Sequence, residues 1–135
     1  MAVMPRVQAV VIPILRDAFV GLKVGSWVED VDYRDFPMLN VRRVGGFRNM
    51  RFPKKLDLAV IELTAYGSEG LIETEKLYSD ALEALYDAAE TQAHSTVGYI
   101  HSVKETMGMT QFSSLFMDSW RVQGLLQIGV RPLSN

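Results

Sequence analysis

Few side chains in this sequence could act as a nucleophile or hold a metal ion, because it contains two histidines and no cysteine. His94 and His101 are seven residues apart on different expected elements, and no further ligands stand at the spacing that a zinc site needs. The absence of cysteine excludes thiol catalysis, zinc ribbons, thiolate-held iron–sulfur clusters and a disulfide framework. The sequence therefore predicts no metal and no cofactor.

Other catalytic patterns are equally weak. The carboxylate pairs Glu29-Asp30 and Glu73/Glu75 fall in solvated settings, where two acids rarely serve as a general acid and base. Gly45-Gly46 follows an expected strand but leads into a basic loop rather than a helix, and neither glycine-rich phosphate motif is present. We therefore expect a protein that is not an enzyme.

The length and composition favour one globular domain over residues 1–135, with 48% hydrophobic and 22% charged residues. No internal repeat or Gly/Ser linker divides the chain. The apolar stretch 7–20 is broken by Pro13, Arg16 and Asp17, so it is too short for a membrane span of about 20 residues. It also lacks a basic segment followed by a cleavage site of small residues, so we expect no export signal.

Two helices are expected from apolar residues at three- and four-residue spacing. The first covers about four turns from Val7 to Phe19, and Pro13 predicts either a kink or two short helices that meet there. The second begins near Ser68, an N-cap candidate, and ends at the polar run 91–96. Its apolar stripe contains Leu71, Tyr78, Ala81, Leu82, Leu85, Ala88 and Ala89.

The remaining segments predict a sheet. A short extended piece (22–28) and an acidic turn (29–37) precede strands at 38–44, 56–66, 98–105 and 120–131, with a basic loop at 47–55 and an aperiodic segment at 106–118. Both faces of 56–66 are apolar enough to indicate a central strand. We therefore expect an α+β fold: a mostly antiparallel sheet of four to five strands with two main helices packed on one face.

The net charge of −2 conceals a marked segregation of charge. Residues 36–56 contain six basic residues and no acid, and they include an extended basic arm at about 45–56. Residues 69–90 contain seven acids and a single lysine, Lys76. Opposite charges on separate elements suit a head-to-tail contact in which the arm of one subunit meets the acidic face of the next.

The aperiodic segment 106–118 is rich in Met and Phe, and its flexible side chains suit a surface that packs against other subunits. The residues expected at interfaces with other subunits or other proteins are Arg42, Arg43, Phe47, Arg48, Arg51, Phe52, Lys54, Lys55, Glu73, Asp80, Glu83, Asp87, Met107, Met109 and Phe112. Two alternatives stay open. The charge pattern also fits a solvated loop beside an ordinary wet helix face. It also fits a small nucleic-acid-binding or regulatory protein that uses the basic loop 42–55, with Phe47 and Phe52 for stacking.

Several motifs, taken in order, resemble those of one known family. They are FPMLNVRRVGG at 36–46, VIELTAY at 60–66, Leu77-Tyr78 and Ala84-Leu85-Tyr86 in the acidic helix, HSVKETMG at 101–108, Gln111-Phe112, and WRVQG at 120–124. Together they resemble the tail terminator proteins of long-tailed siphophages infecting actinobacteria, of the mycobacteriophage type. The resemblance spans nearly the whole chain.

The resemblance implies a small α+β subunit that assembles into a homohexameric ring. In that family the ring caps the tail tube, stops its polymerisation and joins the tail to the head–neck connector. The implied partners are other copies of the chain, the tail tube protein and the connector protein, with no membrane and no sequence-specific nucleic acid, although DNA passes through the ring. The implied location is the head-proximal end of the virion tail, after assembly in the host cytoplasm.

Overall fold

The computed structural model describes residues 3–26, 36–113 and 119–133. In chain order the elements are α1 (Val7–Ala18), β1 (Lys23–Gly25), β2 (Met38–Arg48), β3 (Asp57–Gly67), α2 (Leu71–Thr91), β4 (Gly98–Phe112) and β5 (Trp120–Pro132). The five strands form one sheet in the order β1-β2-β3-β5-β4. Only β1 and β2 pair in parallel, and the other neighbours are antiparallel. The predicted α+β fold with a mostly antiparallel sheet is confirmed.

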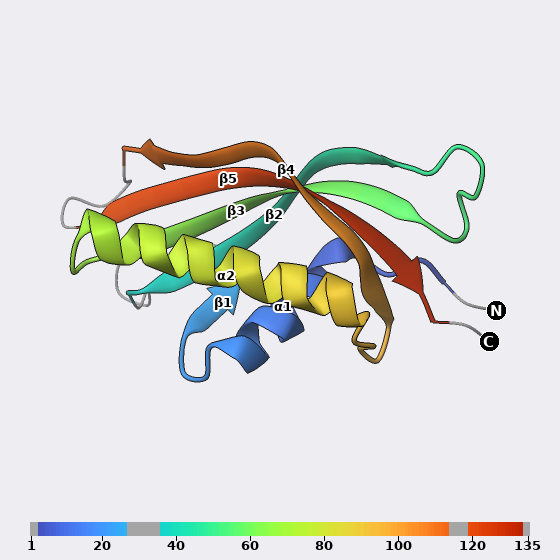
Figure 1. Ribbon diagram of the computed structural model, residues 1–135, viewed down its shortest axis with the longest axis horizontal. Helices are drawn as coiled ribbons and strands as arrows, with labels where there is room; N and C mark the ends of the chain where they lie inside the picture. The colour runs from blue at the N-terminus through green and yellow to red at the C-terminus, as the bar shows by residue number, and fades with distance from the viewer. Residues whose placement is uncertain (1–2, 27–35, 114–118, 134–135) are drawn as a thin grey trace.

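Both helices lie on the same face of this sheet (Figure 1). Because side chains alternate along a strand, every second residue of β3 points toward the helices, and Ala59, Ile61 and Leu63 are fully buried there. The predicted stripe of α2 supplies the opposing surface through Tyr78, Ala81, Leu82, Leu85 and Ala88. The single core therefore fills the space between two helices and one sheet face.

Strands β3 and β5 form the centre of the sheet. They pair without a register shift from Asp57 opposite Val130 to Gly67 opposite Trp120. This continuous ladder aligns Ile61 with Leu126 and Ala59 with Ile128 on the helix side, so both strands deliver matched rows to the core. The predicted central position of the 56–66 strand is confirmed.

Helix α1 runs through Pro13 as one element, so of the two alternatives left open by the sequence, a kink or two short helices, the second is wrong. Proline removes the N–H that would bond to the carbonyl of Ala9, four residues earlier. Ala9 and Pro13 are both exposed, whereas Val10 and Val11 are buried. Water can therefore satisfy the freed carbonyl, and the helix keeps its core contacts.

Helix α2 begins later than predicted, since Gly70 rather than Ser68 occupies the N-cap position. The hydroxyl of Thr74 donates a hydrogen bond to the Gly70 carbonyl at 2.7 Å. Glu73 places an acid in the first turn, near the positive end of the helix dipole. The helix ends at Thr91, followed by Gln92 in the left-handed conformation.

Strands β2 and β4 are longer than predicted, and β1 is shorter. The sequence predicts no strand in the segment 106–118, and this is wrong for its first part, because β4 continues to Phe112. Register shifts around Met107 interrupt the alternation of inward and outward side chains, which is why the sequence has no period of two there. Residues 114–118 and the acidic turn at 29–35 lie outside the described residues.

Tyr78 fixes α2 against β5. Its side chain is 1% exposed, and its hydroxyl lies where a side chain at Gly124 would stand. Burial raises the pKa of Tyr78, and the neighbouring carboxylate of Glu105 raises it further. The phenol therefore stays neutral within the core, and β5 needs glycine at position 124.

A bulge in β2 shapes the arm. The register with β3 shifts between Arg43 and Gly45, and Gly46 follows with a φ of +100°. A Cβ at Gly46 would overlap the carbonyl of Leu58 and the backbone nitrogen of Val60. A bulge increases the local twist of a hairpin, so this glycine sets the direction in which the arm leaves the sheet.

We predict that Gly46→Ala lowers the free energy of unfolding by on the order of 2 kcal/mol, because the backbone conformation and the close approach of β3 both exclude a Cβ. Gly45→Ala is the matched control, since no atom lies within 4 Å of its Cβ position, and it should change stability by less than about 0.5 kcal/mol. Urea unfolding of both variants measures the difference. Equal effects of the two substitutions would contradict this role of Gly46.

Candidate assembly surfaces

The arm (residues 45–56) is an ordered loop at the end of the β2–β3 hairpin. The side-chain carbonyl of Asn49 accepts hydrogen bonds from the backbone N–H groups of Arg51 and Phe52 at 3.0 and 2.9 Å. The N–H of Asn49 donates to the carbonyl of Leu56 at 2.9 Å and closes the loop. Asparagine favours such turns because its side chain replaces a backbone acceptor. The arm therefore has a defined shape without support from the helices, beyond which it projects (Figure 1).

Large apolar side chains on the arm face solvent. Phe47 is 84% exposed, Met50 98% and Phe52 52%. Single exposed apolar residues are common, but three on one short hairpin tip are typical of a surface that contacts another molecule.

The basic residues of the hairpin fall into two groups. Those at its base are bound to cross-strand acids: Arg42 to Glu62 at 3.1 Å, and Arg43 to both oxygens of Asp57 at 2.7 and 3.2 Å. Asp57 is buried, so the second pair joins β2 to β3 where the arm begins. The structure thus gives Arg42 and Arg43 an internal role.

The basic residues of the arm itself keep their charges available. Arg48 donates to the carbonyl of Pro53 at 3.3 Å, and the Arg51 guanidinium lies 5.6 Å from the centre of the Phe52 ring. Lys54 and Lys55 are exposed. Within the part of the chain that the structure describes, these four cations form no ion pair.

The acidic side chains of α2 form the second surface. Asp80 is half-buried and bound to Lys76 at 2.7 Å, whereas Glu73, Glu83 and Asp87 are exposed. Among the described residues, none of these three acids has an ion-pair partner.

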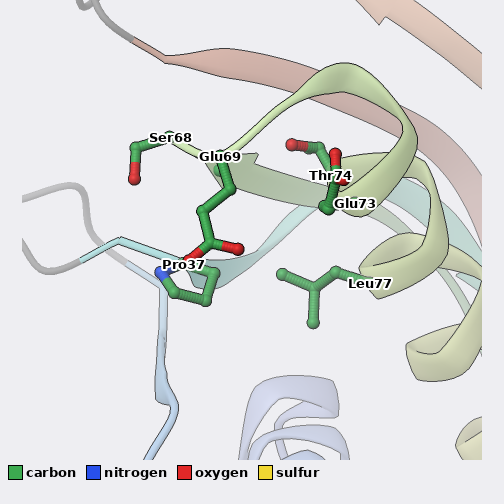
Figure 2. Close-up of a pocket in the computed structure, with 7 residues that line it drawn as sticks. Pro37, Ser68, Glu69, Glu73, Thr74 and Leu77 are labelled. Atoms are coloured by element: carbon green, nitrogen blue, oxygen red, sulfur yellow. The ribbon is translucent and has the colours of Figure 1, made fainter.

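Glu73 also borders a small pocket at the start of α2, of about 130 Å³. Figure 2 shows the Glu69 side chain directed toward Pro37, with Leu77 on the adjacent turn of the helix. The pocket lies between the residue that precedes β2 and the first turns of α2.

The three residues predicted from the Met- and Phe-rich segment lie on β4. Met109 is 42% exposed, and Met107 is half-buried. Phe112 packs beneath Arg121, whose guanidinium carbon lies 5.2 Å from the ring centre. Phe112 is paired with Arg121 at the end of β5 that is remote from the arm.

Apart from Arg42, Arg43 and Asp80, which are paired within the subunit, the predicted residues lie on three separate parts of the molecule. The arm is at one end of the sheet, the part of β4 that carries Met107, Met109 and Phe112 is toward the other end, and α2 lies on the helix side (Figure 1). The fold keeps the basic and acidic surfaces apart, so they cannot neutralise one another within one chain.

Sequence reasoning missed a pocket of about 310 Å³ at the base of the arm. Its lining combines Phe52, Lys55 and Leu56 with His101 of β4 and Arg131 of β5. Neither His101 nor Arg131 stands out in the sequence, because the sheet brings together three segments that are far apart along the chain.

No group of three His, Cys, Asp or Glu side chains in the described ranges is placed to hold a metal ion. Searched over the same ranges, the helices include none that is long and apolar enough to cross a membrane.

The family model described as phage tail termination protein matches residues 3–135, so the chain belongs to that family and is a structural protein of a phage tail. Its relatives include the Gene 22 proteins of Mycobacterium phage L5 and Mycobacterium phage D29, which are 58% and 54% identical to it over 133 residues. Each alignment covers 97% of this chain and 96% of the relative.

The fold also resembles a solved structure at low sequence identity. A chain from the virion of a native gene transfer agent particle matches with a TM-score of 0.62 and 14% identity. The match covers 93% of this chain and 94% of that one.

The Arg43–Asp57 pair should stabilise the base of the arm. We predict that Asp57→Asn lowers the free energy of unfolding by roughly 2 kcal/mol, because the buried negative charge and one of the two acceptors of Arg43 are lost and an amide NH2 then faces the guanidinium. Glu62→Gln is the control and should cost less than about 1 kcal/mol, since the Arg42 side chain opposite it is 61% exposed. Thermal and urea unfolding provide both values. A larger loss for Glu62→Gln would contradict this ranking.

Proposed function

We propose that copies of this chain form a closed homohexameric ring that caps the head-proximal end of the tail tube. The ring stops polymerisation of the tube and offers the surface that the head–neck connector binds. The chain acts through contact, without turning over a substrate. Membership of the phage tail termination protein family is the observation that carries this proposal.

The geometry of the subunit supports a ring. A basic arm with exposed Phe47, Met50 and Phe52 lies on one part of the molecule, and the exposed acids of α2 lie on another. Two different complementary surfaces on one subunit produce a head-to-tail contact, and such contacts close into rings when the rotation between subunits allows it. Burial of the apolar arm residues would add to the attraction between charges.

The three surfaces suggest a division of contacts. The arm and α2 join neighbouring subunits, and the Met- and Phe-bearing end of β4 meets the tube or the connector. Met side chains adapt to partners of different shape, which suits a ring that has unlike neighbours above and below it.

The arm could alternatively bind nucleic acid through Arg51 and Phe52, which already lie together. Phosphate contacts weaken steeply as salt is added. A complex with DNA that disappears between low and moderate salt, with no self-association of the protein, would favour this alternative.

We predict that Arg48→Glu combined with Arg51→Glu prevents ring formation and tail joining while the subunit stays folded. Both side chains are exposed and make no ion pair among the described residues, so their reversal removes attraction to an acidic neighbour without disturbing the core. The measurement is electron microscopy of particles made by a phage whose only copy of this gene encodes the variant, with circular dichroism of the purified protein.

Arg48→Lys combined with Arg51→Lys is the matched control, because it keeps both charges and should still yield joined particles. Normal joining by the charge-reversed variant would show that the arm has no part in assembly.

A further inference from the structure

The pocket at the base of the arm, which we call the basal pocket, has the composition of an anion site. Its nitrogen donors are Lys55 of the arm, His101 of β4 and Arg131 of β5, and none of the described residues that line it is acidic. Phe52 and Leu56 form its apolar part. With about 310 Å³, it has room for one or two carboxyl-bearing side chains.

These donors have no partner among the residues that the structure describes. In the described ranges, the side chains of Lys55, His101 and Arg131 have no hydrogen bond and no ion pair, whereas Arg42 and Arg43 nearby are both bound to acids. Arg131 is half-buried on β5, where it is paired with Tyr99 of β4, so it is only partly exposed to water. A guanidinium in such a setting is suited to binding a carboxylate through paired hydrogen bonds.

The chain also carries a matching anion on the opposite side. Glu83, Asp87 and Glu90 follow one another at spacings of four and three, so they share one face of α2, and all three are exposed. Within the described residues none of them has an ion pair. The last turn of α2 contains no basic residue, so the acids near it face the negative end of the helix dipole. An external cation would relieve this repulsion.

The two features cannot meet in one molecule. Helix α2 covers one face of the sheet (Figure 1). Side chains alternate along β5, so Arg131 lies on the same face as Gln127 and Gly129, and the core residues Ile128 and Val130 lie on the face that the helices cover. They therefore lie on opposite sides of the subunit and could join only different copies.

We propose that the basal pocket binds the acidic face of α2 from a second copy of this chain, so that one or two of the carboxylates of Glu83, Asp87 and Glu90 enter it. The contact is head-to-tail and leaves a free pocket at one end of the assembly and a free acidic helix at the other, so it repeats from subunit to subunit until a ring closes. This inference rests on the proposed ring and adds the residues that join its subunits. It assigns a binding role to His101 and Arg131, which the charge pattern of the sequence did not include.

The test uses two charge-reversed variants of the full chain. The pocket variant carries Lys55→Glu and Arg131→Glu, and the helix variant carries Asp87→Lys and Glu90→Lys. We expect each alone to weaken self-association at least about tenfold in sedimentation velocity, which corresponds to about 1.4 kcal/mol. An equimolar mixture of the two should restore assembly, because alternating subunits make every contact complementary again.

Lys104→Glu is the matched control. It reverses one exposed charge on β4 outside the pocket and should assemble like the wild type. Circular dichroism establishes that each variant is folded. If the pocket variant does not fold, Arg131→Gln alone replaces it, and the exposed positions of the helix variant provide an independent measurement.

The outcomes separate the two proposals. A pocket variant that assembles as the wild type does, while the arm variant Arg48→Glu, Arg51→Glu fails, would overturn the basal pocket and leave the ring intact. A pocket variant that assembles normally but no longer retains DNA would identify a phosphate as the ligand and also overturn it. A wild-type protein that stays monomeric at every concentration would overturn both proposals.

Discussion

The packing of α1 and α2 against a single face of the sheet is the interaction on which the rest of the structure depends. It places the whole core between Val10 and Leu85 on the helices and Ile61 and Leu126 on the central strands. The sheet is longer than the helices that cover it, so the β2–β3 hairpin extends past them (Figure 1). The part that extends cannot bury its apolar side chains within the chain, and the arm is the result.

Ionic contacts in this subunit also differ between the part of the sheet that the helices cover and the arm that extends past them. Where the hairpin leaves the core, Arg43 is bound to the buried Asp57, and this pair belongs to the fold. Beyond that point the cations of the arm and basal pocket have no acid within reach among the described residues, while the acids of α2 stay on the other side. A single subunit therefore carries unsatisfied charge of both signs, and near-zero net charge limits the repulsion among assembled copies.

Sequence alone was sufficient for the elements whose period is regular. The stripe of α2 and the two apolar faces of β3 specify a buried helix and a central strand without reference to other parts of the chain. It was insufficient at Met107 in β4, where register shifts disrupt the alternation of side chains along the strand. It was also insufficient at Pro13 in α1, where the hydrogen bond that proline removes lies on the solvent-exposed side of the helix. The basal pocket was beyond its reach, because the register of β4 on β5 determines that His101 and Arg131 lie beside Lys55.

The measurement that tests the central claim most directly is electron microscopy of tail tubes polymerised with and without the purified protein. The account predicts a ring with a central opening at one end of each tube, and tubes that no longer elongate from that end. Tubes that grow equally in both samples, with bare ends and the added protein present only as monomers, would contradict it.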